Sequence, residues 1–158
     1  MGKVLITGGS GFIGSHVTEK FLENGCEVVI LDNLSTGNEA NIKHLNIKLY
    51  KSDMRDKKAV EEIFEKEDIS HIIHMAAQVS VSHSVEDIRY DMEENITGFL
   101  NILEAAVKYK VKKVVFSSTA AVYGIPENVP SVETDRTKPL SPYGLSKLTG
   151  EEYLKMYF

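Results

Sequence analysis

Short apolar runs alternate along the chain with segments of helical periodicity. The apolar runs lie within Lys3–Thr7, Glu27–Leu31, Ile47–Asp53, His71–Met75 and Lys112–Ser118. Short runs rich in β-branched residues, separated by helical segments, are typical of parallel strands that are buried on both faces of a sheet. We therefore predict a parallel strand in each of these ranges.

The segments between the runs carry apolar residues three or four positions apart, the spacing of an amphipathic helix. This pattern predicts helices over Phe12–Asn24, Lys57–Lys66, Val85–Lys110 and from Pro142 onward. Gly25 follows the first of them, where a helix-terminating glycine is expected. Alternating strands and helices indicate an α/β fold, a doubly wound parallel sheet of Rossmann type with right-handed crossovers. We expect one domain that stops after the fifth strand and its following helix.

Composition narrows the possible functions. The net charge of −5 argues against a nucleic-acid partner, which normally requires a basic surface. The apolar run before the first glycines is too short for a signal peptide or a membrane span, so we expect a cytoplasmic protein without a membrane partner. Cys26 is the only cysteine, which excludes an internal disulfide. His71 and His74 should point to opposite faces of a strand, so we expect no metal site.

A glycine-rich segment, TGGSGFIG, joins the first predicted strand to the first predicted helix. Gly9, Gly11 and Gly14 fit G-x-G-x-x-G, and Gly8, Gly11 and Gly14 equally fit G-x-x-G-x-x-G. Such glycines let the backbone approach a pyrophosphate, while the helix N-terminus supplies N–H groups and positive potential. An ordinary glycine-rich turn is the alternative, but the strand–turn–helix context favours a dinucleotide site.

Asp32 ends the second predicted strand, where a carboxylate that binds the adenosine ribose is expected. A carboxylate accepts hydrogen bonds from a ribose 2′-hydroxyl and repels a 2′-phosphate. The segment DNLSTG also offers no arginine to receive that phosphate. The sequence therefore favours NAD over NADP, although Asp32 could instead cap a turn.

Hydroxyl groups follow the fifth predicted strand, and a tyrosine–lysine pair opens the last helix. Ser117, Ser118 and Thr119 stand where the ligand crevice of an open α/β sheet is expected. In SPYGLSK, Ser141 suits the helix N-cap, so Tyr143 and Lys147 fall one turn apart on one helix face. A free tyrosine has a pKa of about 10, and a nearby ammonium and the positive helix end both favour its ionised form. By spacing alone the pair could be two exposed side chains.

Taken together, TGGSGFIG, LDNLSTG, SDMRD, HMAAQVSVSHSVED, FSSTAAVYG and SPYGLSK strongly resemble the extended short-chain dehydrogenase/reductase superfamily. Within it, the chain resembles the UDP-glucose 4-epimerase-like, NAD-dependent epimerases of sugar nucleotides. The resemblance implies that Tyr143 is the catalytic acid/base, that Lys147 favours its ionised form and holds the nicotinamide ribose, and that Thr119 binds the sugar 4-hydroxyl. It implies further cofactor contacts from Gly8, Gly11, Phe12, Ile13, Gly14, Asp32, Asn33, Ser35, Thr36, Asp53, Met54, Ala76, Ala77, Asn95 and Ser117.

The same resemblance favours epimerisation over dehydration. Related sugar-nucleotide 4,6-dehydratases carry an Asp–Glu pair after the matching threonine, whereas this chain has Ala120 and Ala121. Members of the family continue into a C-terminal domain that binds the nucleotide-sugar. We therefore expect the NAD-binding portion of a UDP-hexose epimerase, weak or inactive alone. A freestanding NAD- or nucleotide-binding or interaction module is the alternative.

A fifth strand without a further neighbour should leave an unpaired sheet edge, which favours self-association. Apolar residues on the last helix should add to that surface: Leu145, Leu148, Tyr153, Leu154, Tyr157 and Phe158. In the resembled family, the helix matching Val85–Lys110 forms dimers. We therefore expect a homodimer or another self-associated form.

Overall fold

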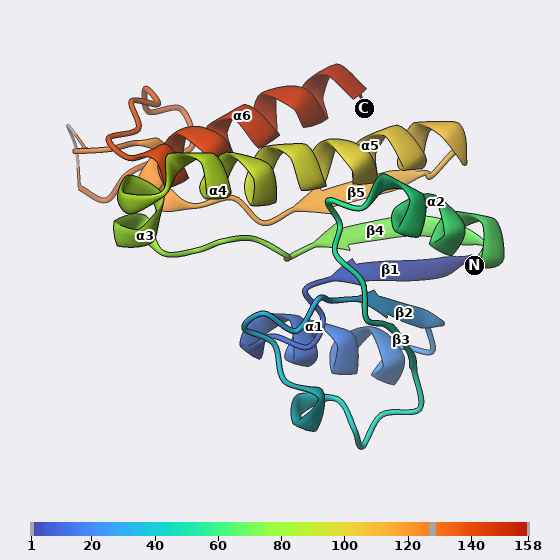
Figure 1. Ribbon diagram of the computed structural model, residues 1–158. Coiled ribbons are helices and arrows are strands. Elements are labelled where there is room, and N and C mark those ends of the chain that lie inside the picture. The colour runs from blue at the N-terminus through green and yellow to red at the C-terminus, as the bar shows by residue number, and fades with distance from the viewer. Residues whose placement is uncertain (1, 127–128, 158) are drawn as a thin grey trace.

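The computed structural model describes residues 2–126 and 129–157. Within these residues the chain forms a five-stranded parallel sheet in the order β3–β2–β1–β4–β5 (Figure 1). The strands are β1 (Lys3–Thr7), β2 (Val28–Leu31), β3 (Lys48–Tyr50), β4 (Ile69–His74) and β5 (Lys113–Phe116). The order reverses beside β1, which confirms the predicted doubly wound sheet.

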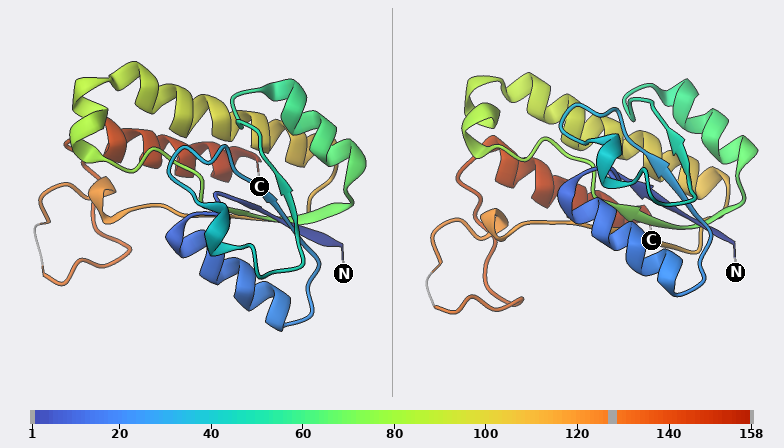
Figure 2. Two further views of the ribbon diagram at one scale, coloured as in Figure 1. Left: turned by 60° about the horizontal axis from the view of Figure 1, so that its bottom comes forward. Right: turned by 90° about the horizontal axis from the view of Figure 1, so that it is seen from below.

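Helices cover both faces of this sheet (Figures 1 and 2). Helix α1 (Phe12–Glu23) packs on one face, and α2 (Lys57–Lys66), α5 (Gly98–Lys108) and α6 (Pro142–Tyr157) pack on the other. Neighbouring residues of β1 therefore enter different cores, because Leu5 contacts the α2–α5 side and Ile6 the α1 side. Each such side chain is fully buried and contributes about 1.5–3 kcal/mol by the hydrophobic effect.

The predicted helix from Val85 to Lys110 is wrong at its beginning. Two short helices, α3 (Val81–Glu86) and α4 (Ile88–Met92), meet at Asp87, which leaves the helical conformation with φ −134° and ψ 83°. The Asp87 side chain accepts a hydrogen bond from Tyr90 N and so caps α4. Capping by aspartate therefore overrode the apolar periodicity at this point.

A π-helical turn, η2 (Glu93–Thr97), joins α4 to α5. Successive residues of an α-helix point in directions about 100° apart, yet Glu94 and Asn95 are both buried in this turn. Single π-helical turns often occur at functional sites. This turn places two neighbouring polar side chains inside the molecule, beside α6.

Strand β5 forms one edge of the sheet in the described part of the chain. On α6, Leu145 and Tyr157 are exposed, but Tyr153 and Leu154 pack against the core rather than extend an apolar surface. Phe158 lies outside the described residues. Self-association through this region therefore remains a prediction. Among the residues described, no helix has the length and apolarity needed to cross a bilayer.

Candidate functional site

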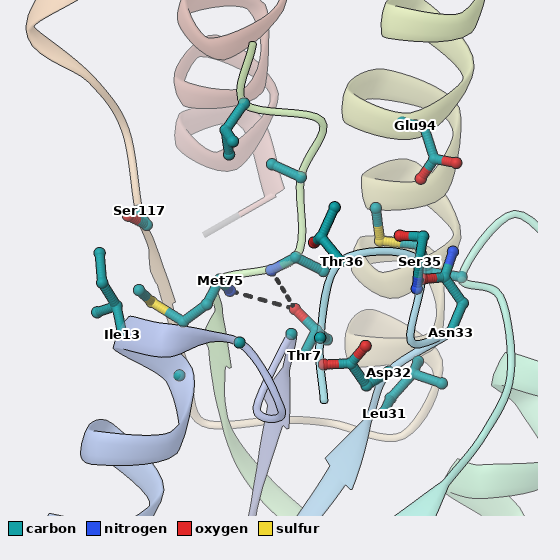
Figure 3. A pocket seen from close by; sticks show the side chains of 18 of the residues that line it. Thr7, Ile13, Leu31, Asp32, Asn33, Ser35, Thr36, Met75, Glu94 and Ser117 are labelled. Atoms are coloured by element: carbon teal, nitrogen blue, oxygen red, sulfur yellow. Dashed lines mark hydrogen bonds between the residues drawn. The ribbon is translucent and has the colours of Figure 1, made fainter. Parts of the chain in front are cut away.

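A cleft of about 490 Å³ opens at the carboxyl ends of the strands, beside the point where the strand order reverses (Figure 3). Sixteen residues predicted from the sequence to serve the site line this cleft. They are Gly8, Gly11, Phe12, Ile13, Gly14, Asp32, Asn33, Ser35, Thr36, Met54, Ala76, Ala77, Ser117, Ser118, Tyr143 and Lys147. Three others, Asp53, Asn95 and Thr119, are not part of its wall.

The glycine segment forms a tight turn between β1 and α1. Gly8 has φ +69°, a conformation that favours glycine, and a Cβ there would lie 2.7 Å from Ala76 N. A Cβ on Gly14 would overlap the carbonyl oxygen of Gly8. Helix α1 begins after Gly11 with no side chain capping its N-terminus and no acidic residue in its first turn. Its first N–H groups are therefore available to an anion in the cleft.

Asp32 follows β2 and lies in the cleft wall (Figure 3). One carboxylate oxygen accepts from Ser10 N at 2.9 Å and the other from Leu34 N at 2.8 Å. The contact with Leu34 is the turn cap that the sequence left open as an alternative. Each carboxylate oxygen has a second lone pair, so this capped carboxylate can still accept a ribose hydroxyl.

Thr7 and Met75 also line the cleft and were missed by the sequence analysis. The Thr7 hydroxyl oxygen accepts from Met75 N and Ala76 N at 3.2 and 3.3 Å, as Figure 3 shows. Because that oxygen already accepts twice, its own hydrogen is directed to His74 Nδ1, 2.9 Å away. Burial lowers the pKa of His74 to about 3, with the Lys147 charge acting in the same direction. The position of Thr7 at the end of β1 could have identified it.

At the opposite end of the cleft, helix α6 presents Tyr143 and Lys147. Ser141 Oγ accepts from Gly144 N at 3.1 Å, which confirms the predicted N-cap. Tyr143 N donates to Ser84 Oγ of α3, also at 3.1 Å. Both residues line the same cleft as Ser117, which follows β5. The structure thus brings the predicted pair and one of its predicted hydroxyl neighbours into one site.

Lys147 carries an unusual buried charge. Only 3% of its surface is exposed, and its Nζ lies 4.4 Å from the centre of the Phe116 ring. Burial lowers the pKa of Lys147 to about 8, while the negative charge of Asp91 acts to raise it. Near neutral pH the group is therefore mostly a cation, and small changes around it would alter its charge.

The π-helical turn directs Glu94, rather than its neighbour Asn95, into the wall of the cleft. Glu94, which the sequence analysis missed, lies in the cleft wall, whereas the predicted Asn95 does not. Asn95 is buried and bonds both backbone groups of Gln78, accepting from its N at 2.8 Å and donating to its O at 2.9 Å. Asn95 therefore fixes the loop after β4 that lines the cleft. No local sequence pattern identifies Glu94, because its orientation depends on the π-helical turn.

Asp53 and Thr119 also lie outside the cleft wall, and each forms hydrogen bonds to nearby residues instead. The Asp53 carboxylate binds Arg55 through two hydrogen bonds to the guanidinium and accepts from Asn33 Nδ2 at 3.2 Å. The Arg55 contact lowers the pKa of Asp53 to about 2. Thr119 Oγ1 accepts from Ala121 N and begins a short 3-10 turn, η3 (Ala120–Val122). In this structure both side chains are occupied by internal hydrogen bonds.

The arrangement fits a dinucleotide. The uncapped N-terminus of α1 suits a pyrophosphate, Asp32 at one end suits ribose hydroxyls, and the buried ammonium of Lys147 suits hydroxyls at the other end. Side chains on the glycines would obstruct the turn that creates this space. Among the described residues, no group of histidine, cysteine or carboxylate side chains is arranged to hold a metal ion.

Comparison with known proteins agrees with this geometry. The family described as "NAD dependent epimerase/dehydratase family" matches residues 4–158. A putative UDP-glucose 4-epimerase of Methanocaldococcus jannaschii is 50% identical over 155 residues, which cover 98% of this chain and 50% of that protein. The chain thus spans about half the length of the curated relatives it matches.

Solved structures give the same result. The UDP-glucose 4-epimerase of Thermus thermophilus, determined in complex with NAD, superposes with a TM-score of 0.94 at 47% identity, covering 98% of this chain and 50% of that one. The UDP-Glc/GlcNAc 4-epimerase of Campylobacter jejuni superposes with a TM-score of 0.96 at 37% identity, covering 99% and 49%.

Proposed function

The chain belongs to the NAD-dependent epimerase/dehydratase family, and from this we propose that it is the NAD-binding portion of a UDP-glucose-type 4-epimerase. The observation that carries the proposal is a single cleft lined by Asp32, the uncapped end of α1, Tyr143 and Lys147. A nucleotide-binding module without catalysis would require only the first two. The intact pair at the other end therefore favours an epimerase.

In the proposed reaction, NAD, when bound, would supply the group that takes up a hydride from C4 of the sugar and gives it back on the other face. Tyr143 removes the proton of the 4-hydroxyl and later restores it. Lys147, a cation held inside the cleft wall, stabilises the ionised tyrosine and holds ribose hydroxyls. Ser117 and Ser118 orient polar groups near the reacting carbon, and Thr119 would reach the sugar only after releasing Ala121 N.

The substrate and the remaining contacts are part of the proposal. Residues 1–158 form the NAD-binding domain, and the groups that bind the UDP-hexose lie in the part of the relatives that this chain does not match. NAD is preferred to NADP because Asp32 repels a 2′-phosphate. The protein acts in the cytoplasm as a homodimer.

Calorimetric titration of the purified chain with NAD and with NADP tests the cofactor assignment. We expect NAD to bind at least tenfold more tightly than NADP. Tyr143→Phe should bind NAD like the parent chain, because the phenol is needed only for proton transfer. Absence of NAD binding at millimolar concentration would refute the proposal.

Incubation of the chain with UDP-galactose tests whether turnover needs the half of the relatives that this chain does not match. NAD binding without turnover is expected from this chain alone, and measurable turnover would contradict the claim that the unmatched half of the relatives is needed. Fusion to the half of the Methanocaldococcus jannaschii relative that this chain does not match should restore turnover. The Tyr143→Phe substitution in this fusion should abolish turnover again. A fusion that binds NAD but never turns over would favour the freestanding binding module.

A further inference from the structure

Two buried charges on facing helices lack a direct partner. The described residues include five charged side chains that are almost completely buried: Asp32, Glu67, Asp91, Glu94 and Lys147. Glu67 pairs with Lys48 at 2.7 Å, Glu94 lies 3.2 Å from Arg55, and Asp32 accepts two backbone N–H groups. Asp91 and Lys147 have no oppositely charged group within 4.0 Å in the described part of the chain. They carry opposite charges and lie on packed elements, α4 and α6.

Neutral donors hold Asp91 in place. Its Oδ1 accepts from Gln78 Nε2 at 3.0 Å and from Asn95 Nδ2 at 3.2 Å. Asn95 Nδ2 also donates to the Oγ of Ser146, the residue before Lys147, at 3.2 Å. Only 1% of the Asp91 surface is exposed. The carboxylate is therefore fixed beside α6 with its charge unscreened by water.

In the described part of the chain, the other groups around Lys147 come from β4, β5, α6 and the π-helical turn. From β4 it meets His74, which burial keeps neutral, and from β5 the ring of Phe116. Its neighbours on α6 are Tyr143 and Glu151, whose carboxylate accepts from Ser118 at an exposed position where water screens its charge. Glu94, from the π-helical turn, is directed to Arg55. Among the described residues, Asp91 is thus the buried carboxylate best placed to offset the ammonium, because it has no cation within 4.0 Å and lies on a helix packed against α6.

We propose that Asp91 is a positioning residue, whose buried negative charge keeps Lys147 protonated and facing the cleft although the two groups do not touch. An ammonium taken out of water needs a compensating charge, and in a buried site an opposite charge favours the charged form even without direct contact. Lys147 titrates only slightly above neutral pH even with Asp91 present. Loss of the Asp91 charge should therefore reduce the fraction of Lys147 that is cationic near neutral pH. The consequence for NAD and Tyr143 rests on the proposed function, but the pairing itself does not.

The first test measures the pKa of Lys147 by carbon-13 NMR of protein labelled at the lysine ε-carbons, with Lys147→Met used for assignment. Asp91→Asn keeps the Oδ1 acceptor for Gln78 and Asn95 and removes the charge. We expect the pKa of Lys147 to fall by about one unit. The matched control is Asp87→Asn, which removes the same charge from an exposed position one turn earlier and preserves the N-cap. It should change the pKa by less than about 0.3 units, since an exposed charge is screened by water.

The second test is a double-mutant cycle on the free energy of unfolding, with Asp91→Asn, Lys147→Met and the pair. Asp91→Asn should destabilise the parent chain at pH 7. In the Lys147→Met background it should be neutral or stabilising, because the carboxylate there is an uncompensated buried charge. The same loss of stability in both backgrounds, or an unchanged pKa of Lys147 in Asp91→Asn, would overturn the inference. Neither measurement uses NAD, so a chain that fails to bind NAD would refute the proposed function alone.

Discussion

At the glycine-loop end of the cleft, Asp32 and Asp53 bind residues no more than 22 positions away, whereas at the other end Tyr143 and Asn95 bind residues more than 50 positions away. Asp32 accepts from Leu34 N and Asp53 binds Arg55, each two positions away. At the other end, Tyr143 N binds Ser84 and Asn95 binds Ser146, across 59 and 51 positions. The contacts of Asp32 and Asp53 therefore lie within residues 10–55, whereas those of Tyr143 and Asn95 join α6 to segments from the middle of the chain.

The two ends also respond to opposite extremes of pH. Asp53, beside the glycine-loop end, has its pKa lowered to about 2 by Arg55. Lys147, at the other end, has its pKa lowered to about 8 by burial. The ion pair at the first end stabilises the fold, while the buried cation at the second destabilises it. The Tyr143–Lys147 end therefore lowers the stability of the fold where the Asp53–Arg55 pair raises it, and the predictions below test this contrast.

The largest effect is expected from Gly14→Ala. Its Cβ would overlap Gly8 O, so the glycine turn must move, and we expect a loss of several kcal/mol in the free energy of unfolding and at least a hundredfold weaker NAD binding. Urea denaturation measures the free energy of unfolding, and calorimetric titration measures the affinity for NAD. Gly25→Ala is the control, because Gly25 also has a positive φ, +75°, but a Cβ there meets no atom within 4 Å. It should cost about 1 kcal/mol and leave NAD binding intact. Equal losses in both variants would contradict a special role for the turn.

Lys147→Met should stabilise the fold while it weakens NAD binding. The folded pKa of Lys147, about 8, lies below the ordinary lysine value of 10.5, so folding releases a proton between these pH values and stability rises with pH across that window. Below about pH 8 the buried charge therefore costs the full difference, on the order of 3 kcal/mol, which the methionine variant should recover. Parent and variant should converge near pH 10.5. A variant less stable than the parent at pH 7 would show that Lys147 is compensated more fully than the structure indicates.

Asp53→Asn should act at the acidic end of the pH range. Because the folded pKa of Asp53 lies below its ordinary value of 3.8, its stabilising contribution is complete above that value and is lost as pH falls towards 2. We expect the variant to be about 1 kcal/mol less stable at pH 7 and equal to the parent near pH 2, since the carboxylate is partly exposed and screened. Denaturation curves across this range measure the difference. A constant difference at all pH values would indicate a steric effect instead.

The smallest effect is expected from Thr119→Ala. In the structure Thr119 caps a 3-10 turn and does not line the cleft, so we expect a loss of about 0.5–1 kcal/mol in stability and an unchanged dissociation constant for NAD. Ser117→Ala is the comparison, because Ser117 does line the cleft. A marked loss of NAD affinity in Thr119→Ala alone would show that this side chain turns into the cleft when the cofactor binds.

Motif spacing and strand periodicity were sufficient to predict the parallel sheet, the glycine turn, Asp32 and the Tyr143–Lys147 pair. Each depends on a local rule: a buried strand is apolar, a tight turn needs glycine, and residues one turn apart share a helix face. The break at Asp87, the inward position of Glu94 and the structural role of Asn95 did not follow from these rules. They depend on an aspartate cap and on a π-helical turn that packs against α6, where Asn95 donates to Ser146.

The electrostatic state of the site was decided by tertiary structure alone. The sequence places a lysine beside a tyrosine, but only packing shows that Lys147 is almost fully buried and that the compensating carboxylate, Asp91, comes from a different helix. Apolar periodicity is a property of neighbouring residues and can be read from them. The energy of a buried charge depends on every group that surrounds it in three dimensions, and these come from distant parts of the chain.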